Sequence, residues 1–166
     1  MTERGDIVWC TSHTLVGAAI RYAQRRDGEA DWDVNHIAIV NEAVEGTTDF
    51  TVIQAETHGV TSNKLLSTIT PLGRHLVIPF PDDRADRERF MAMVSSKVGD
   101  HYSWLSVASA AFDMVLPDAV DLRRGGTFDC SGLAAYGLLY AGFAPLTNVP
   151  DIYTVTPARL ATLLRS

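Results

Sequence analysis

The chain has 166 residues, of which 46% are hydrophobic and 20% charged, with a formal net charge of -6 at pH 7. This composition predicts a single globular domain over residues 1–166 and excludes a disordered chain. The acidic balance, without a long run of Lys or Arg, argues against nucleic-acid binding.

The chain also lacks the sequence features of a membrane protein. No stretch approaches the roughly 20 apolar residues that a membrane helix needs, and residues 1–6 contain no apolar signal core. We therefore expect no membrane span and synthesis in the cytoplasm without an export signal. The two cysteines, Cys10 and Cys130, form no CxxC pair, so a disulfide is allowed but a reduced compartment is equally consistent.

The first half of the chain favours strands. In chain order we expect a strand at 6–10, a helix capped by Ser12 or Thr14 that runs to about Arg26, strands at 34–41, 50–56 and 75–80, and a further short strand at 58–60. Residues 45–49 predict a hairpin connection between the strands on either side.

The second half favours helices. We expect one capped by Asp82 or Asp83 that ends before Gly99 and buries Phe90, Met91, Val94 and Val98, a second at 102–115, a third from Cys130 to about 141, and a last one with Thr156 as its cap and Pro157 as its first residue. Strands first and helices later predict an α+β fold with a small antiparallel sheet.

The segment Asp129-Cys130-Ser131-Gly132-Leu133 places a cysteine at the start of an apolar helix, behind an N-cap aspartate. Unsatisfied N–H groups and the positive end of the helix dipole favour an anion there, so the position is expected to bias the thiol toward thiolate. The alternative is a buried, inert helix cysteine. The polar neighbours and the open space beside Gly132 favour the nucleophile.

A thiol nucleophile needs a base and a group that orients the base. His36 opens the strongest predicted strand, although a structural histidine fits the same position. On the next strand, period two puts Val52, Gln54 and Glu56 on one face, so Gln54 or Glu56 could reach a histidine on the neighbouring strand. The alternative for this face is a solvated sheet surface.

A zinc site is an alternative interpretation of the same residues, with less support from the sequence. His36, Glu56, His58 and a cysteine could be combined into one, but no helical or knuckle spacing supports it. We therefore expect no metal and no cofactor. The remaining histidines, His13, His75 and His101, are expected to be surface or structural groups.

The Asp129–Leu133 motif resembles the cysteine motif of the NlpC-like branch of papain-fold cysteine peptidases. The order His36, then Gln54 or Glu56, then Cys130 resembles the circularly permuted branch of that superfamily, which includes relatives of lecithin retinol acyltransferase. The resemblance covers roughly residues 5–142, including a Gly99-to-Tyr102 segment that is similar to a family motif upstream of the cysteine.

The resemblance implies a permuted papain-like fold with Cys130 as nucleophile and His36 as base. In the permuted branch the third residue is commonly a glutamate, and Gln54 stands at that position here, with Glu56 as the second choice. Tyr102 and the Cys130 backbone N–H are the implied donors to the oxyanion, although Tyr102 also fits a packing role.

The implied activity is acyl transfer through a thioester, with peptidoglycan stem peptides or related small amides as substrates. Without a signal peptide, such an enzyme would act on recycled wall fragments in the cell or be delivered by a phage particle or secretion device. One alternative is an acyltransferase or lipid-amide hydrolase of the same fold, with an apolar groove lined by Trp104, Leu105, Phe112 and Met114. Another is a non-catalytic papain-fold binding module, which the glutamate-to-glutamine change favours.

Overall fold

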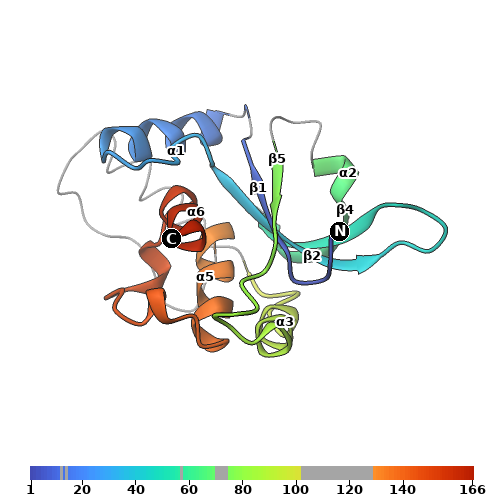
Figure 1. Cartoon of the computed structure of the whole chain (residues 1–166). Helices are drawn as coiled ribbons and strands as arrows, with labels where there is room; N and C mark the ends of the chain where they lie inside the picture. Colours follow the sequence, from blue (N-terminus) through green and yellow to red (C-terminus); the bar gives the residue numbers. More distant parts are fainter. Residues whose placement is uncertain (12, 14, 57, 70–74, 102–128) are drawn as a thin grey trace.

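A computed structural model describes residues 1–11, 13, 15–56, 58–69, 75–101 and 129–166. Its centre is a five-stranded antiparallel sheet (Figure 1). The strands are β1 (Ile7–Cys10), β2 (His36–Ala43), β3 (Phe50–Glu56), β4 (Gly59–Leu65) and β5 (His75–Ile78), in the spatial order β4-β3-β2-β1-β5. The predicted α+β class with a small antiparallel sheet is therefore confirmed.

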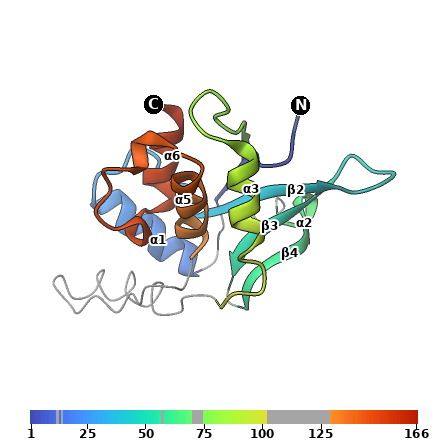
Figure 2. The same cartoon turned by 90° about the horizontal axis from the view of Figure 1, so that it is seen from below.

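Helices cover the sheet unequally (Figure 2). They are α1 (Leu15–Arg26), α2 (Leu66–Ile69), α3 (Arg87–Ser95), α5 (Cys130–Tyr140) and α6 (Pro157–Arg165), with short 3-10 turns η2 (Ala144–Leu146) and η3 (Ile152–Thr154). Helix α5 contacts both α3 and α6, and it also packs on β2 and β3. Within the described ranges, no helix is long and apolar enough to cross a membrane.

Alternation along the strands divides the sheet into two buried faces. The main face carries Ile7, Trp9, Ile37, Ile39, Ile53 and Ala55, and packs against α3, α5 and α6. The second face carries Val8, Cys10, Ala38, Val40 and Val52, and packs against Ile69 at the end of α2. Both faces of the central strands are therefore buried, which explains why their sequences read as nearly continuous apolar runs.

Most strand predictions are confirmed to within two residues. The third strand has the bounds expected, and residues 45–49 connect β2 to β3 as a hairpin, with Val44 N–H donating to Asp49 O. Strand β4 is longer than the 58–60 segment predicted, because polar residues 61–64 pair with β3 at the sheet edge. The helix predicted at 102–115 lies outside the described residues.

The predicted start of α3 is wrong. The cap is Asp86, whose carboxylate accepts from Arg89 N–H, while Asp82 accepts instead from the Arg87 guanidinium. The predicted burial of Val98 is also wrong, since the helix ends at Ser95 and the side chain of Val98 is 40% exposed in the turn that follows. Helix α6 begins as predicted at Pro157, with the Thr156 hydroxyl accepting from Arg159 N–H.

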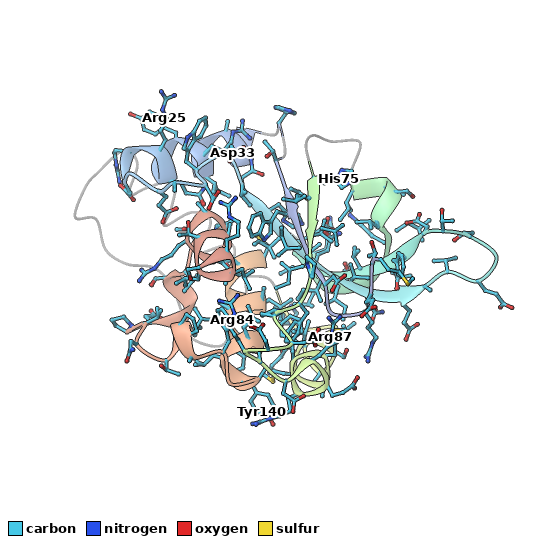
Figure 3. The ribbon with its side chains drawn as sticks, in the orientation of Figure 1. Arg25, Asp33, His75, Arg84, Arg87 and Tyr140 are labelled. Atoms are coloured by element: carbon cyan, nitrogen blue, oxygen red, sulfur yellow. The ribbon has the colours of Figure 1, made fainter. Side chains whose placement is uncertain are left out.

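Two arginines tie α3 and the loop before it to the rest of the domain (Figure 3). Arg87 donates to Asp82 and to Asp6, and the buried Asp6 also accepts from the Phe80 N–H at 3.0 Å. Arg84 donates to the Leu164 carbonyl at 2.8 Å. These bonds satisfy a buried carboxylate and connect the start of β1 to α3 and α6.

Gln24, at the end of α1, fixes the chain entering β2. Its buried amide nitrogen donates to the carbonyls of Trp32 and Val34 at 2.9 and 2.8 Å, and its oxygen accepts from Ala158 N–H in the first turn of α6. One side chain thus connects α1, the loop before β2 and α6. Because β2 begins two residues after Val34, this network determines where His36 enters the sheet.

Helices α3 and α5 approach each other closely at Gly137. A Cβ at this position would lie 2.7 Å from Val94 Cγ2 and 2.9 Å from the Phe90 ring. Both distances are shorter than van der Waals contact, so only glycine allows the two helices to pack as they do.

We expect Gly137→Ala to lower the free energy of unfolding by about 1–2 kcal/mol. Overpacking of a core typically costs about 1–3 kcal/mol, which exceeds the gain of up to about 1 kcal/mol from better helix propensity. Urea unfolding of the single variants and of the Gly137→Ala/Val94→Ala pair measures the coupling. If the added methyl group of Gly137→Ala clashes with Val94, the double variant loses less free energy of unfolding than the two single variants lose together. A loss equal to or larger than that sum would contradict the clash.

Candidate active site

Cys130 is the first residue of α5, as predicted. The Asp129 carboxylate accepts from Gly132 N–H at 2.6 Å and from the Ser131 hydroxyl at 3.2 Å, so Asp129 is the N-cap. The following residues are apolar and pack into the main core. The sequence therefore sets the helix start directly before the cysteine, and the cap holds the thiol in a fixed position on the helix.

The environment of Cys130 differs from the expected one. Its side chain is only 7% exposed, and burial raises the pKa of the thiol to about 12. The charge of Asp129 contributes to this rise, while the backbone N–H groups of Ile37 and Ser131 oppose it. The expectation that the helix start biases this thiol toward thiolate is thus wrong, because desolvation outweighs the helix-terminal donors.

His36 is the first residue of β2, and its ring is bonded to Gln54 on β3. The distance between His36 Nε2 and Gln54 Oε1 is 2.8 Å. An amide oxygen only accepts hydrogen bonds, so Nε2 carries the proton and Nδ1 carries the lone pair of the neutral ring. Burial lowers the pKa of His36, against the opposing effects of Gln54 and Glu56, and Lys64 lowers it further. The resting imidazole is therefore neutral at pH 7.

The two candidates for the orienting residue have different partners. Gln54 is 1% exposed and contacts His36. Glu56 is bonded to Lys64 on β4, with 2.6 Å between Lys64 Nζ and Glu56 Oε2. The geometry therefore favours Gln54 over Glu56, in line with its position in the sequence motif.

The structure places Cys130 beside the backbone of β2 but records no hydrogen bond between its thiol and His36. Cys130 packs in the main core, and the N–H of Ile37, the residue next to His36, is among the groups that lower the pKa of its thiol. Alternation assigns His36 and Gln54 to the second face, with Ala38. Thiol and ring therefore meet the same end of β2 from its two faces.

Cys10 is a second thiol close to the proposed base. It lies directly opposite His36 in the β1–β2 register and is buried on the second face. Burial raises its pKa to about 12. Both cysteines are free thiols. Cys10 therefore fills the end of its strand and provides a matched buried thiol for comparison with Cys130.

The remaining histidines are surface groups, as expected for three of them, His13, His75 and His101. His13, His58, His75 and His101 are exposed, and Tyr102 lies outside the described residues. Within the described part of the chain, no group of three or more His, Cys, Asp or Glu side chains is arranged to hold a metal ion.

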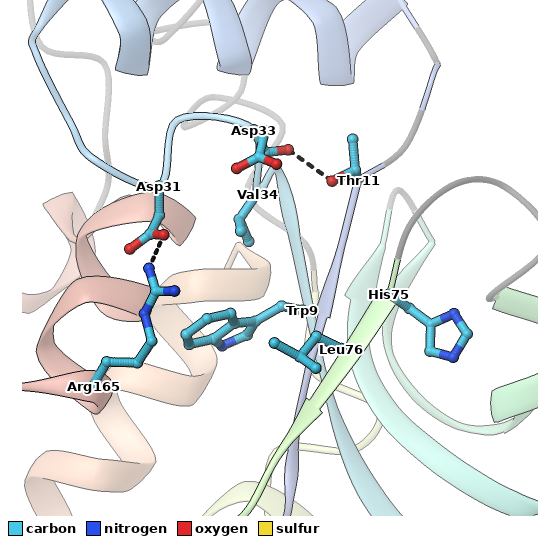
Figure 4. Close-up of a pocket in the computed structure, with 8 residues that line it drawn as sticks. All are labelled: Trp9, Thr11, Asp31, Asp33, Val34, His75, Leu76 and Arg165. Atoms are coloured by element: carbon cyan, nitrogen blue, oxygen red, sulfur yellow. Dashed lines mark hydrogen bonds and ion pairs between the residues drawn. The ribbon is translucent and has the colours of Figure 1, made fainter.

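A hollow of about 260 Å³ lies at the end of the sheet where β1 ends and β2 begins (Figure 4). It is lined by Trp9, Thr11, Asp31, Asp33, Val34, His75, Leu76 and Arg165. Asp31 is paired with Arg165, whose guanidinium lies over the Trp9 ring. The lining is thus mixed, with charged groups around an aromatic wall. Sequence reasoning missed this hollow, because no local pattern brings the C-terminal arginine to the loop before β2.

Comparisons of the chain with protein-family models, with curated proteins and with solved structures find no match.

The two buried thiols provide a direct test of the ionisation state. In Cys10→Ala and Cys130→Ala proteins, we expect iodoacetamide to react with the remaining cysteine about 10³-fold more slowly at pH 7 than with a free cysteine, because a pKa of about 12 leaves correspondingly little thiolate. Intact mass against time gives the rates, and urea-unfolded protein is the control. Labelling of Cys130 at the free-cysteine rate would contradict a neutral resting thiol.

Proposed function

We propose that this protein is a cysteine hydrolase of the permuted NlpC-like papain type. In this proposal Cys130 is the nucleophile, His36 the general base and Gln54 the residue that orients it. The proposal rests above all on the hydrogen bond between His36 Nε2 and Gln54 Oε1, which leaves the Nδ1 lone pair available to take a proton. The capped helix start at Cys130 and the sequence motif around it provide further support.

The reaction begins from a neutral thiol and a neutral imidazole. As the Cys130 sulfur attacks the carbonyl carbon of an amide, its proton passes to His36 Nδ1. Because the thiol and the ring contact the end of β2 from its two faces in the free protein, this step requires the His36 ring to turn around the strand end toward the thiol in the substrate complex. The Cys130 backbone N–H donates to the oxyanion of the tetrahedral intermediate, and the family resemblance implies Tyr102 as the second donor.

The second half of the reaction returns the protons. Imidazolium donates its proton to the leaving amine as the carbon–nitrogen bond breaks, which gives a thioester on Cys130. His36 then takes a proton from water, whose oxygen attacks the thioester carbonyl, and returns it to the departing thiolate. Because Gln54 is uncharged, it orients the ring without stabilising the imidazolium as a carboxylate would.

Small polar amides, such as peptidoglycan stem peptides, are the proposed substrates. The hollow at the start of β2 is lined by Asp31, Asp33 and Arg165 around Trp9, which suits a charged peptide better than a fatty-acyl chain. One observation favours the alternative of a non-catalytic binding module, namely the burial of an un-ionised Cys130 thiol. Turnover assays distinguish these functions.

We expect the wild-type protein to release products from muropeptides and not from fatty-acyl amides, as measured by product masses. Cys130→Ala is expected to abolish turnover because it removes the nucleophile, whereas Cys10→Ala, the matched buried thiol, is expected to keep it. Equal product with Cys130→Ala would exclude the thiol mechanism. Turnover of fatty-acyl amides alone would favour the lipid-amide alternative, and no turnover of either would favour the binding module.

The pH profile tests the roles of His36 and Gln54. A base is active when unprotonated, and the pKa of His36 is lowered from 6.5, so kcat/KM is expected to stay level down to pH 6.5 and to fall only below it. Gln54→Glu adds a negative charge beside the ring and is expected to move this acid limb to higher pH. Glu56→Gln removes a charge that raises the pKa of His36, so we expect a small move to lower pH.

His36→Ala is the control, for which we expect a loss of activity of about 10²- to 10⁴-fold. A larger loss of activity in Glu56→Ala than in Gln54→Ala would instead make Glu56 the orienting residue.

A further inference from the structure

Gln54, whose side-chain oxygen binds His36, has a buried side-chain nitrogen without a hydrogen-bond partner among the described residues. The Nε2 atom of Gln54 is buried and has no hydrogen-bond partner among the described residues, and the same is true of the Thr61 hydroxyl oxygen. Gln54 and Thr61 are direct partners in the β3–β4 register. Directly opposite side chains of an antiparallel pair lie on the same face, with Cβ atoms about 4.5–5.5 Å apart.

These two atoms are complementary. An amide nitrogen donates two hydrogen bonds, and a threonine hydroxyl oxygen accepts them. A polar group that is buried without a partner costs the full free energy of its desolvation. One hydrogen bond between Gln54 Nε2 and the Thr61 hydroxyl would offset this cost for both groups. The required movement is a side-chain adjustment within one cross-strand pair.

We propose that Thr61 is a positioning residue of the candidate active site, whose hydroxyl accepts a hydrogen bond from Gln54 Nε2 and so keeps Gln54 Oε1 turned toward His36. This inference rests on the proposed function for its catalytic meaning. Its structural content, a three-residue chain from β4 through β3 to β2, stands independently. Thr61 acts on the reaction only through Gln54 and His36.

The row of hydrogen bonds from Thr61 through Gln54 to His36 determines which ring nitrogen of His36 carries the proton. With Oε1 toward the ring, Nε2 is protonated and Nδ1 is the base. If the amide turned over, its NH₂ group would donate to Nε2 and the proton would move to Nδ1. The charged groups that act on His36 are Glu56 on β3 and Lys64 on β4, and they pair with each other.

The test is the tautomer of His36, read from the ¹⁵N chemical shifts of its ring nitrogens in ¹⁵N-histidine-labelled protein. We expect wild type and Thr61→Ser, which keeps the hydroxyl, to show Nε2–H as the dominant form. In Thr61→Val, which has the same shape without the hydroxyl, the Nδ1–H form is expected to rise several-fold. Thr61→Ala provides the same readout if valine prevents folding. Asn63→Val, an exposed change on the same strand, is the control for added β-branching.

Activity gives the second readout. We expect kcat of Thr61→Val to fall by about tenfold, because the Nδ1–H tautomer has no lone pair on Nδ1 and cannot act as the base. KM is expected to stay nearly unchanged, because substrate binding does not depend on the tautomer. Thr61→Ser is expected to keep the wild-type kcat. Unchanged tautomer populations in folded Thr61→Val and Thr61→Ala proteins would overturn the proposal. A tautomer shift in a protein without turnover would uphold the positioning and overturn the hydrolase function instead.

Discussion

The packing of α5 onto β2 and β3 is the contact on which both the fold and the candidate site depend. Gly137 lets α3 approach α5, and the Asp129 cap starts α5 at the cysteine, so the helix meets the sheet with its first residue against the backbone beside His36. The same contact buries the thiol. A tightly packed helix start therefore fixes Cys130 beside β2 and removes it from the solvent that would stabilise a thiolate.

The neutral state of both groups determines the kind of chemistry that this site can perform. Burial raises the pKa of Cys130 and lowers that of His36, so the charged pair is unfavourable at rest for both partners. In the proposed mechanism, proton transfer therefore accompanies attack, as general-base catalysis. An uncharged Gln54 fits this state, since a buried carboxylate at the same position would favour imidazolium and itself require desolvation.

Local patterns were sufficient to predict most elements. Alternation along β3 limited the partner of His36 to Gln54 or Glu56, and only the family resemblance favoured Gln54, which the structure places against the ring. Alternation defined β3, and an N-cap aspartate defined the start of α5. Choosing Asp86 as the cap of α3 required knowing that Asp82 binds Arg87, a contact that forms only when the loop before the helix folds back on its first turn. The pKa of Cys130 could likewise not be predicted from the neighbouring residues in sequence. Burial against strands that are distant in sequence raises this pKa by more than the N–H groups at the helix start lower it.

The most direct test of a Cys130 nucleophile with a His36 base is the capture of the acyl-enzyme. The protein is mixed with an activated acyl ester and quenched in acid, and the acyl group is located by peptide mass analysis. The account predicts about one acyl group per chain, on Cys130, retained in Cys10→Ala and strongly reduced in His36→Ala. Acylation of Cys130 at the same rate in His36→Ala, or acylation of Cys10 instead, would contradict it.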